Sequence, residues 1–188
     1  MIIMDTITNQ ILKTACGGTI LVSKKEREHL NAHNEIIDIL PEVVKKIVLP
    51  FDTERLQLQV DLGKTVGRSS LLETVQIEAN TPCWFAKRRE RLGPSRVITD
   101  INPAETSVIS IIANAITSDR YELVSAWYGE MAPKEPWDPI LADDPPAFKE
   151  SINFWCSHAL VHDSEVMDEP FETTWDEIIN KGEGGIIQ

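Results

Sequence analysis

"SVISIIANAITSDRYELVSAWY", from Ser107 to Tyr128, is the stretch that decides the fold of this chain. Two apolar segments flank the turn-forming residues Thr117–Arg120, and this order predicts a β-hairpin. If the hairpin closes symmetrically, Ile112 pairs with Ser125. The expected polar surface consists of Ser110, Asn114, Tyr121, Ser125 and Trp127, and the expected core surface of Ile109, Ile111, Ala113, Val124 and Ala126. A sheet with one buried face and one hydroxyl-bearing face is typical of an active-site floor or of a solvent-facing sheet.

Helices are predicted upstream of this hairpin. "SKKE", Ser23–Glu26, is a capping box, which predicts a helix from about residue 24 to residue 34. A second helical segment follows as far as Pro50, and Pro41 is expected to break or restart it. "LQLQVDL", Leu56–Leu62, then alternates apolar and polar residues, as a half-buried strand does.

The remaining segments complete the predicted order. Further strands are expected over residues 71–79, 83–89 and 95–99, a helix over 147–161, and an acidic, largely unpatterned tail with a short helix near "TWDEIIN". Because helices and strands are segregated, we predict an α+β fold: N-terminal helices packed on an antiparallel β-sheet of four to six strands, followed by a C-terminal helix and acidic tail. Residues 1–162 are expected to form a single domain, with the tail over 163–188.

The net charge of −12 is unevenly distributed along the chain. Residues 130–188 contain fourteen acidic and three basic side chains, whereas residues 1–129 contain sixteen acidic and fifteen basic side chains. This asymmetry is typical of a solubilising tail or of a segment that binds a partner. Nucleic-acid-binding domains are usually basic, so the total charge argues against RNA, although the nearly neutral body weakens that objection.

Cysteine usage and apolar runs limit the class of protein. Cys16, Cys83 and Cys156 are odd in number and far apart, which argues against a disulfide framework or a CxxC metal site and favours a reducing, cytoplasmic location. The sequence contains no run of about 18 apolar residues, so we expect no membrane span. It also contains no dinucleotide fingerprint or phosphate-binding glycine loop, and we expect no cofactor.

A basic segment, "FAKRRERLGPSR", runs from Phe85 to Arg96 in this acidic chain. One interpretation is a solvated loop. The other is a phosphate site, because arginine pairs bidentately with phosphate oxygens. Lys87 and Arg89 share one side of an extended strand, the turn at "GPSR" can return Arg96 toward Lys87, and Trp84 precedes the bases. An aromatic ring beside guanidinium groups is typical of nucleic-acid binding.

Histidines occur in two pairs with helical spacing. His29 and His33 fall on one face of the first predicted helix, where they suit general acid–base chemistry near neutral pH. A zinc site is the alternative, but "HLNAH" lacks the glutamate of HExxH, and structural histidines are equally consistent. His158 and His162 border an apolar stripe, which favours a structural role.

Two stretches together resemble the barnase–EndoU–colicin–RelE class of small metal-independent ribonucleases. "REHLNAHNEIIDILPEVVKKIVLP" is similar to the opening of that class, in which a helical histidine precedes a second helix that ends near a proline. "TSVISIIANAI…YELVSAWYGE" is similar to its closing hairpin, with Ser125 at a threonine, Trp127 at a tyrosine and Gly129 at a glycine. The resemblance covers about residues 24–130.

The resemblance implies RNA cleavage without a metal ion, in which the ribose 2′-hydroxyl attacks the adjacent phosphate. This reaction needs proton transfer and cations where negative charge develops. His29 or His33 is the candidate for proton transfer. Lys87 and Arg96 are candidates for stabilising the phosphorane, and Ser125 for donating to a phosphate oxygen. The expected substrate-binding residues are Arg68, Trp84, Arg89 and Trp127.

Two other interpretations stay open. In one, the chain is a non-catalytic interaction module, antitoxin-like or immunity-like, whose acidic C-terminal third engages a basic protein. In the other, its histidines and arginines are structural. A further hypothesis is that the acidic tail covers the basic segment and holds it inactive.

Overall fold

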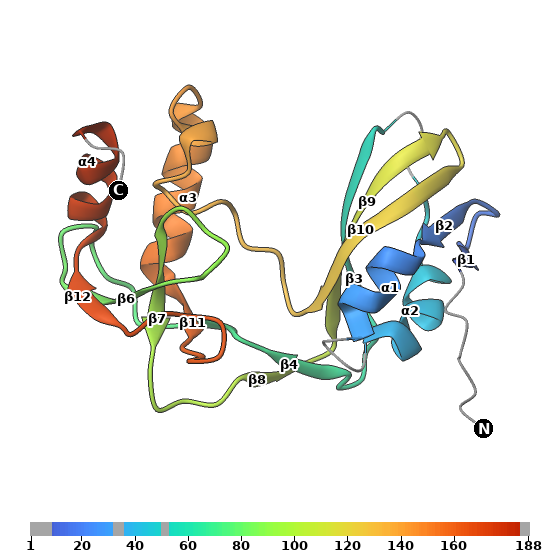
Figure 1. The fold of residues 1–188 in the computed structure, drawn as a ribbon, viewed down its shortest axis with the longest axis horizontal. Helices are drawn as coiled ribbons and strands as arrows, with labels where there is room; N and C mark the ends of the chain where they lie inside the picture. The colour runs from blue at the N-terminus through green and yellow to red at the C-terminus, as the bar shows by residue number, and fades with distance from the viewer. Residues whose placement is uncertain (1–8, 32–35, 50–52, 185–188) are drawn as a thin grey trace. The chain divides into compact units, whose positions relative to one another are not determined.

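The computed structural model describes residues 9–31, 36–49 and 53–184, and these form two compact units (Figure 1). The first unit contains residues 1–68 and 105–131, and the second contains residues 69–104 and 132–188. Each unit has its own hydrophobic core. This division differs from the single domain expected over residues 1–162 with a tail over 163–188.

The first unit is built on a five-stranded sheet with the order β1-β2-β10-β9-β3. Its strands are β1 (Gln10–Lys13), β2 (Thr19–Val22), β3 (Arg55–Asp61), β9 (Val108–Thr117) and β10 (Arg120–Tyr128). Neighbours are antiparallel except β2 and β10, which are parallel. Helices α1 (Lys24–Asn31) and α2 (Ile36–Val44) pack against β10. The core includes Ile20, Leu40, Leu56, Ile109 and Ile111, all of them fully or almost fully buried.

The expected hairpin of β9 and β10 is confirmed, including the pairing of Ile112 with Ser125. A register shift between Leu123 and Ser125 places one extra residue on β10, as a β-bulge does. Between the bulge and the turn, the side chains therefore exchange faces relative to the symmetric prediction. Tyr121 is in the core instead of on the polar surface, and Val124 is 38% exposed instead of buried.

The serine cap of the predicted capping box is also confirmed. The Ser23 hydroxyl accepts a hydrogen bond from the Glu26 amide at 3.3 Å, which satisfies one of the unpaired N–H groups at the start of α1. The second helix differs from the prediction, because α2 runs through Pro41 without a break. Strand β3 lies within one residue of the predicted segment at each end.

The second unit is built on another five-stranded sheet, with the order β12-β6-β7-β11-β5. Its strands are β5 (Leu71–Glu73), β6 (Cys83–Lys87), β7 (Pro94–Ile98), β11 (His158–Val161) and β12 (Phe171–Thr173). Neighbours are antiparallel except β7 and β11, which are parallel. The core includes Phe85, Val97, Trp155 and Trp175.

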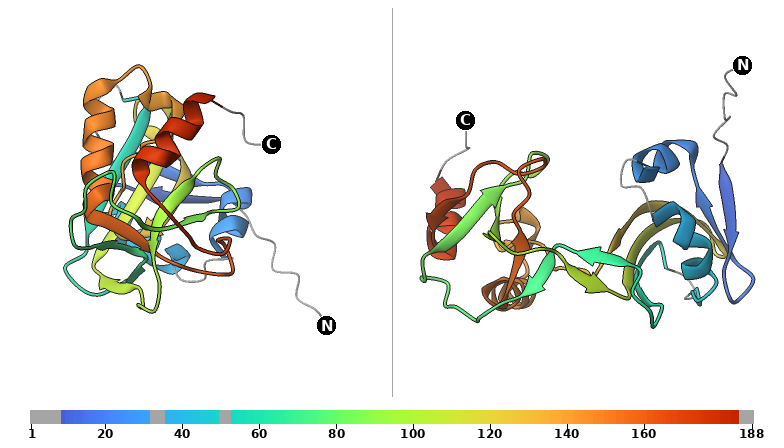
Figure 2. Two further views of the ribbon diagram at one scale, coloured as in Figure 1. Left: turned by 90° about the vertical axis from the view of Figure 1, so that its left-hand side faces the viewer. Right: turned by 90° about the horizontal axis from the view of Figure 1, so that it is seen from below.

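Helices α3 (Pro145–Ser157) and α4 (Trp175–Gly184) belong to the second unit (Figure 2). A one-turn 3₁₀ helix, η1 (Pro139–Leu141), precedes α3. Asp144 caps α3 by accepting from the Ala147 amide at 3.1 Å. The helix predicted over residues 147–161 ends at Ser157, because residues 158–161 form β11 between β5 and β7.

The predicted fold class is wrong. Strands β1 and β2 precede the first helix, and the strands divide into three sheets, the third formed by β4 (Gly67–Ser69) and β8 (Ala104–Thr106). Residues 163–184 are not a tail, since they contain β12 and α4. The missed strands are only three or four residues long, and strands that short show little periodicity of their own. None of the helices in the described ranges is long and apolar enough to span a membrane.

Candidate functional site

A hollow of about 610 Å³ lies in the first unit beside the end of β10. Its lining residues come from the loop before β4, from β4 itself, from β8 and from the last residue of β10: Thr65, Val66, Gly67, Arg68, Glu105 and Tyr128. A volume of this size is in the range of small-ligand sites. The hollow therefore brings a guanidinium, a carboxylate, a phenol and a hydroxyl to one place.

Tyr128 is fixed in this hollow by the backbone of β4. A Cβ atom at Gly67 would lie 2.6 Å from the Tyr128 ring, so only glycine permits this close approach. Tyr128 pairs with Ile109, a core residue, and its side chain therefore lies on the helix-covered side of the sheet.

Arg68 and Glu105 lie on β4 and β8, the two strands of the small sheet. Both side chains are exposed. The Thr65 hydroxyl donates to Glu105 Oε2 at 3.5 Å, and the Val66 amide donates to the Thr106 carbonyl at 2.8 Å. The pairing of these strands sets the carboxylate and the guanidinium at the rim of the same hollow.

Ser125 and Trp127 lie on the other face of β10. Side chains alternate along a strand, so both point away from the face that carries Tyr128. The Trp127 Nε1 donates to the Glu130 carbonyl at 3.3 Å, and the Ser110 hydroxyl donates to the Gly129 carbonyl at 2.7 Å. These contacts hold the chain as it leaves β10.

The basic segment of the second unit surrounds a buried carboxylate. Glu135 is 2% exposed and accepts hydrogen bonds from the Arg88 guanidinium and from the Ser95 hydroxyl, the latter at 2.7 Å. Arg91 Nη1 lies 3.8 Å from the other carboxylate oxygen. Burial lowers the pKa of Arg88 from its usual value, while Glu135 opposes this shift. Two of the five bases in the segment thus serve this ion-pair cluster.

Arg96 is also used inside the second unit. Its side chain is 6% exposed, and its Nη1 donates to the carbonyls of Trp155 at 3.3 Å and Cys156 at 2.9 Å. Its Nη2 donates to the Val75 carbonyl at 3.4 Å. A cation at the C-terminal end of α3 satisfies carbonyls that have no partner within the helix. We therefore leave Arg96 out of the candidate site.

The other predicted residues of this segment are exposed. Lys87 and Arg89 lie on or just after β6, and Arg89 Nη2 donates to the Ser164 carbonyl at 3.4 Å. Trp84, on β6, is 50% exposed. The predicted site residues are thus divided between units: Arg68, Ser125 and Trp127 belong to the first unit, and Trp84, Lys87, Arg89 and Arg96 to the second.

The two predicted proton-transfer residues are not located by side chain. His29 is on α1, which packs against β10, but its side chain lies outside the described part of the structure. His33 lies outside the described residues altogether. Both stay predictions from the sequence.

Sequence reasoning missed Tyr128, Glu105 and Glu135. Tyr128 follows Trp127 in the hairpin, and strict alternation assigns its side chain to the core face. The side chain is partly buried against that core. Glu105 lines the same hollow as Arg68 because β4 pairs with β8, and no local sequence pattern predicts that pairing. Glu135 is separated from Arg88 by 47 residues.

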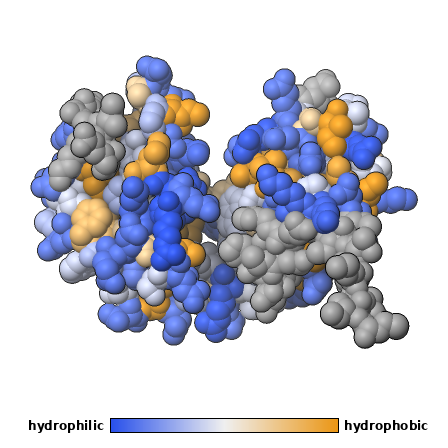
Figure 3. All heavy atoms as spheres, viewed as in Figure 1, coloured by the Kyte–Doolittle hydropathy of each residue, from blue (hydrophilic) through white to orange (hydrophobic). Residues whose placement is uncertain are grey.

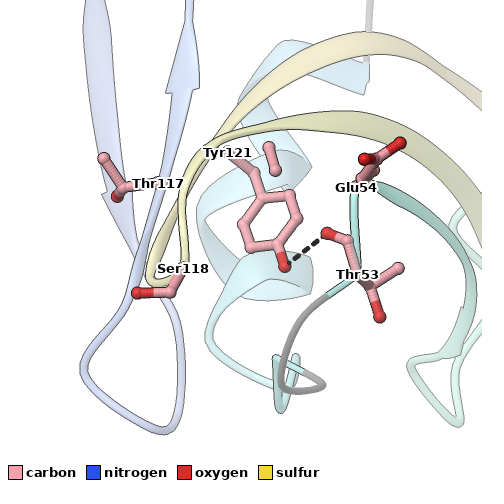
Figure 4. A pocket seen from close by; sticks show the side chains of 6 residues that line it. Thr53, Glu54, Thr117, Ser118 and Tyr121 are labelled. Carbon is pink, nitrogen blue, oxygen red and sulfur yellow. Dashed lines mark hydrogen bonds between the residues drawn. The ribbon is translucent and has the colours of Figure 1, made fainter.

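A second hollow, of about 280 Å³, lies by the turn between β9 and β10 (Figure 4). Tyr121 is fully buried beneath it, and its hydroxyl donates to the Thr53 carbonyl at 3.0 Å. The remaining lining residues are Glu54, Ala115, Thr117 and Ser118, and of these only Glu54 is ionisable. Because these residues supply a negative charge and no cation, the hollow is a poor site for phosphate.

The three cysteines are expected to differ in reactivity. Cys16 is exposed, and a hydrogen bond shared with the Thr14 hydroxyl, together with one donated by the Leu49 amide at 3.3 Å, lowers the pKa of its thiol. Burial raises the pKa of Cys83 and of Cys156. Since the thiolate is the reactive form, iodoacetamide should alkylate Cys16 at least about tenfold faster than the other two at neutral pH.

Peptide mass spectrometry over time measures these rates. The rate at Cys16 should reach half its plateau at a lower pH than the rates at Cys83 and Cys156. In urea, where the native hydrogen bonds are lost, the three rates should converge. Equal rates in the native protein would contradict the described surroundings of Cys16.

No group of three or more histidine, cysteine, aspartate or glutamate side chains gathers to hold a metal ion within the described ranges. Comparison of the chain with models of protein families, with curated proteins and with solved structures found no match.

Proposed function

We propose that the first unit cleaves RNA by attack of the ribose 2′-hydroxyl on the adjacent phosphate. The observation that carries the proposal is the convergence of Arg68, Glu105 and Tyr128 on one hollow beside the central strand. The resemblance to metal-independent ribonucleases supports it, since it rests on α1, α2 and the β9–β10 hairpin, which all belong to this unit.

Each group in the hollow suits one part of the reaction. Glu105 accepts the proton of the 2′-hydroxyl while its oxygen forms a bond to phosphorus. Arg68 stabilises the charge that develops on the phosphoryl oxygens. The bond from phosphorus to the 5′-oxygen breaks, and Tyr128 protonates that oxygen. His29 remains the candidate from the sequence for assisting proton transfer.

Charge distribution is compatible with this assignment. The second unit carries 17 acidic and 8 basic side chains, and the first carries 13 acidic and 10 basic. Most of the negative charge therefore belongs to the second unit. Screening over about 8 Å at physiological salt lets the local field of Arg68 act on a phosphate.

The test is incubation of the full chain with end-labelled RNA in EDTA. Cleavage should leave 2′,3′-cyclic phosphate ends, identified by mass spectrometry. Arg68→Ala should lower the single-turnover rate by about 10²-fold or more, because it removes stabilisation of the transition-state charge. Glu105→Gln should lower it by about 10²-fold, because it removes the proposed proton acceptor.

Arg55→Ala is the matched control, since Arg55 is an exposed arginine on β3 of the same unit and does not line the hollow. Its cleavage rate should stay within about twofold of the parent rate. The circular dichroism spectrum of every variant should match that of the parent, which shows that each variant is folded. Intact RNA at high protein concentration would refute the proposed function. If Arg68→Ala leaves the cleavage rate unchanged, the active site lies outside this hollow.

A further inference from the structure

The second unit has a strongly acidic surface, because it carries 17 acidic and 8 basic side chains and four of those bases have partners within the unit. Arg88 and Arg91 face Glu135, Arg96 donates to carbonyls at the end of α3, and Lys134 Nζ lies 3.5 Å from Asp138. Most of its 17 acidic side chains are exposed. Hydrophilic residues cover most of the visible surface of this unit, interrupted by separate apolar patches (Figure 3).

One edge of the second sheet combines this negative charge with an edge strand. β12 is the end strand of the sheet, and in the described part of the chain it has a strand neighbour only on the β6 side. The edge extends toward residue 167, since Met167 bridges to Arg88 and the Asp168 amide donates to the Lys87 carbonyl at 2.9 Å. The exposed residues along it are Asp168, Glu169, Phe171 and Glu172, followed by Asp176 and Glu177 at the start of α4.

Aromatic side chains are exposed on both faces of this edge. Trp84 is 50% exposed and stands opposite Glu172, so the two side chains share one face. Phe171 is 45% exposed and stands opposite Phe85, on the other face. An arginine or lysine that stacks on Trp84 can therefore pair with Glu172 as well.

We propose that this edge docks an extended, arginine- and lysine-rich segment of a partner protein. The charge determines the kind of partner. Like charges repel a second copy of the same edge, which is one way in which proteins protect unpaired strands, and they repel nucleic acid too. A basic strand instead gains ion pairs with Glu169 and Glu172, contacts with the two aromatic rings, and backbone hydrogen bonds along the edge.

The proposal is independent of RNA cleavage, which is assigned to the first unit. The test uses the full chain and a fluorescent peptide of alternating arginine and valine, with binding followed by anisotropy. Saturable binding is expected, with a Kd that rises with salt concentration. Glu172→Lys should raise the Kd by at least about tenfold, and Trp84→Ala by about fivefold, because the two side chains share one binding face.

Glu150→Lys is the matched control, since Glu150 is exposed on α3 and the charge change is identical. It should alter the Kd by less than about twofold. Equal weakening by Glu150→Lys and Glu172→Lys would overturn the proposal, as would absence of saturable binding or tighter binding of a short RNA than of the peptide. Glu172→Gln replaces the lysine variant if the latter does not fold, and it should still raise the Kd.

Discussion

Replacing Trp175 with alanine is expected to remove about 3–5 kcal/mol from the free energy of unfolding of the second unit. Trp175 is fully buried, its ring meets Phe85 edge-on with centroids 4.7 Å apart, and Trp155 lies 6.4 Å away. Its Nε1 has no hydrogen-bond partner among the described residues, so the stabilisation comes from packing. A loss of this size is a large fraction of the stability of a typical domain.

Hydrogen exchange with mass spectrometry reports each unit separately and does not depend on tryptophan fluorescence. Peptides from β6, β7 and α3 should exchange faster in Trp175→Ala, whereas peptides from β9 and β10 should stay near the parent rate. Trp84→Ala is the control, since Trp84 is half exposed and its removal should cost less than about 1 kcal/mol. Equal effects of the two substitutions would show that α4 does not contribute to this core.

The same packing bears on the hypothesis of a removable acidic tail. Deletion after His162 would take away β12, α4 and Trp175 together. The deletion is therefore expected to unfold the second unit and not to uncover a functional surface. A change of binding in such a truncated chain would then reflect the loss of folded structure.

Glu135→Ala is expected to have the second large effect, also about 3–5 kcal/mol on the second unit. The carboxylate is 2% exposed and is shared by Arg88, Arg91 and Ser95. Its removal leaves the half-buried Arg88 guanidinium and the buried Ser95 hydroxyl without this acceptor, and an unpaired buried group costs much more than an exposed one. Urea denaturation followed by far-ultraviolet circular dichroism measures the change.

Asp138→Ala provides the comparison. Asp138 lies near Lys134, whose side chain is 55% exposed, so the loss of that ion pair should cost less than about 1 kcal/mol. The Asp138 side chain also accepts from the Ile140 amide, so a small additional loss at η1 is expected. If both variants lose the same stability, Glu135 does not organise the basic segment.

These contacts account for a concentrated run of bases in an acidic chain. Arg88 and Arg91 hold the loop after β6 to a buried carboxylate, and Arg96 caps α3. Trp137 also holds this loop: its Nε1 donates to the Pro94 carbonyl at 2.7 Å, and its ring packs so closely on Gly93 that a Cβ atom there would lie 2.5 Å from it. The structural interpretation of these arginines is thus the one that their contacts favour.

Local signals in the sequence were sufficient where neighbours along the chain make the structure. The turn residues and apolar runs predicted the β9–β10 hairpin, and Ser23 with Glu26 predicted the start of α1. The bulge beside Val124 was not predictable, because one extra residue on a strand leaves the alternation of residue types ambiguous. The faces of Tyr121 and Val124 therefore differ from the prediction.

The candidate site shows the same division between local and distant information. Arg68 was a candidate from its charge, but its partners in the hollow depend on the pairing of β4 with β8 and on the end of β10. Lys87, Arg89 and Arg96 were candidates from their spacing, yet Arg96 donates to carbonyls at the end of α3. The arginines beside them, Arg88 and Arg91, face the distant Glu135.

The sequence by itself determined the central hairpin, the first helix cap, the strand over residues 55–61 and the concentration of negative charge after residue 130. Only the tertiary structure decided that there are two units, that residues 163–184 complete the second, and that its arginines serve buried partners. The physical reason is the range of the interactions. Capping and turn formation act within a few residues, whereas β12 pairs with a strand more than 80 residues earlier, and such pairing leaves no periodic mark in the sequence.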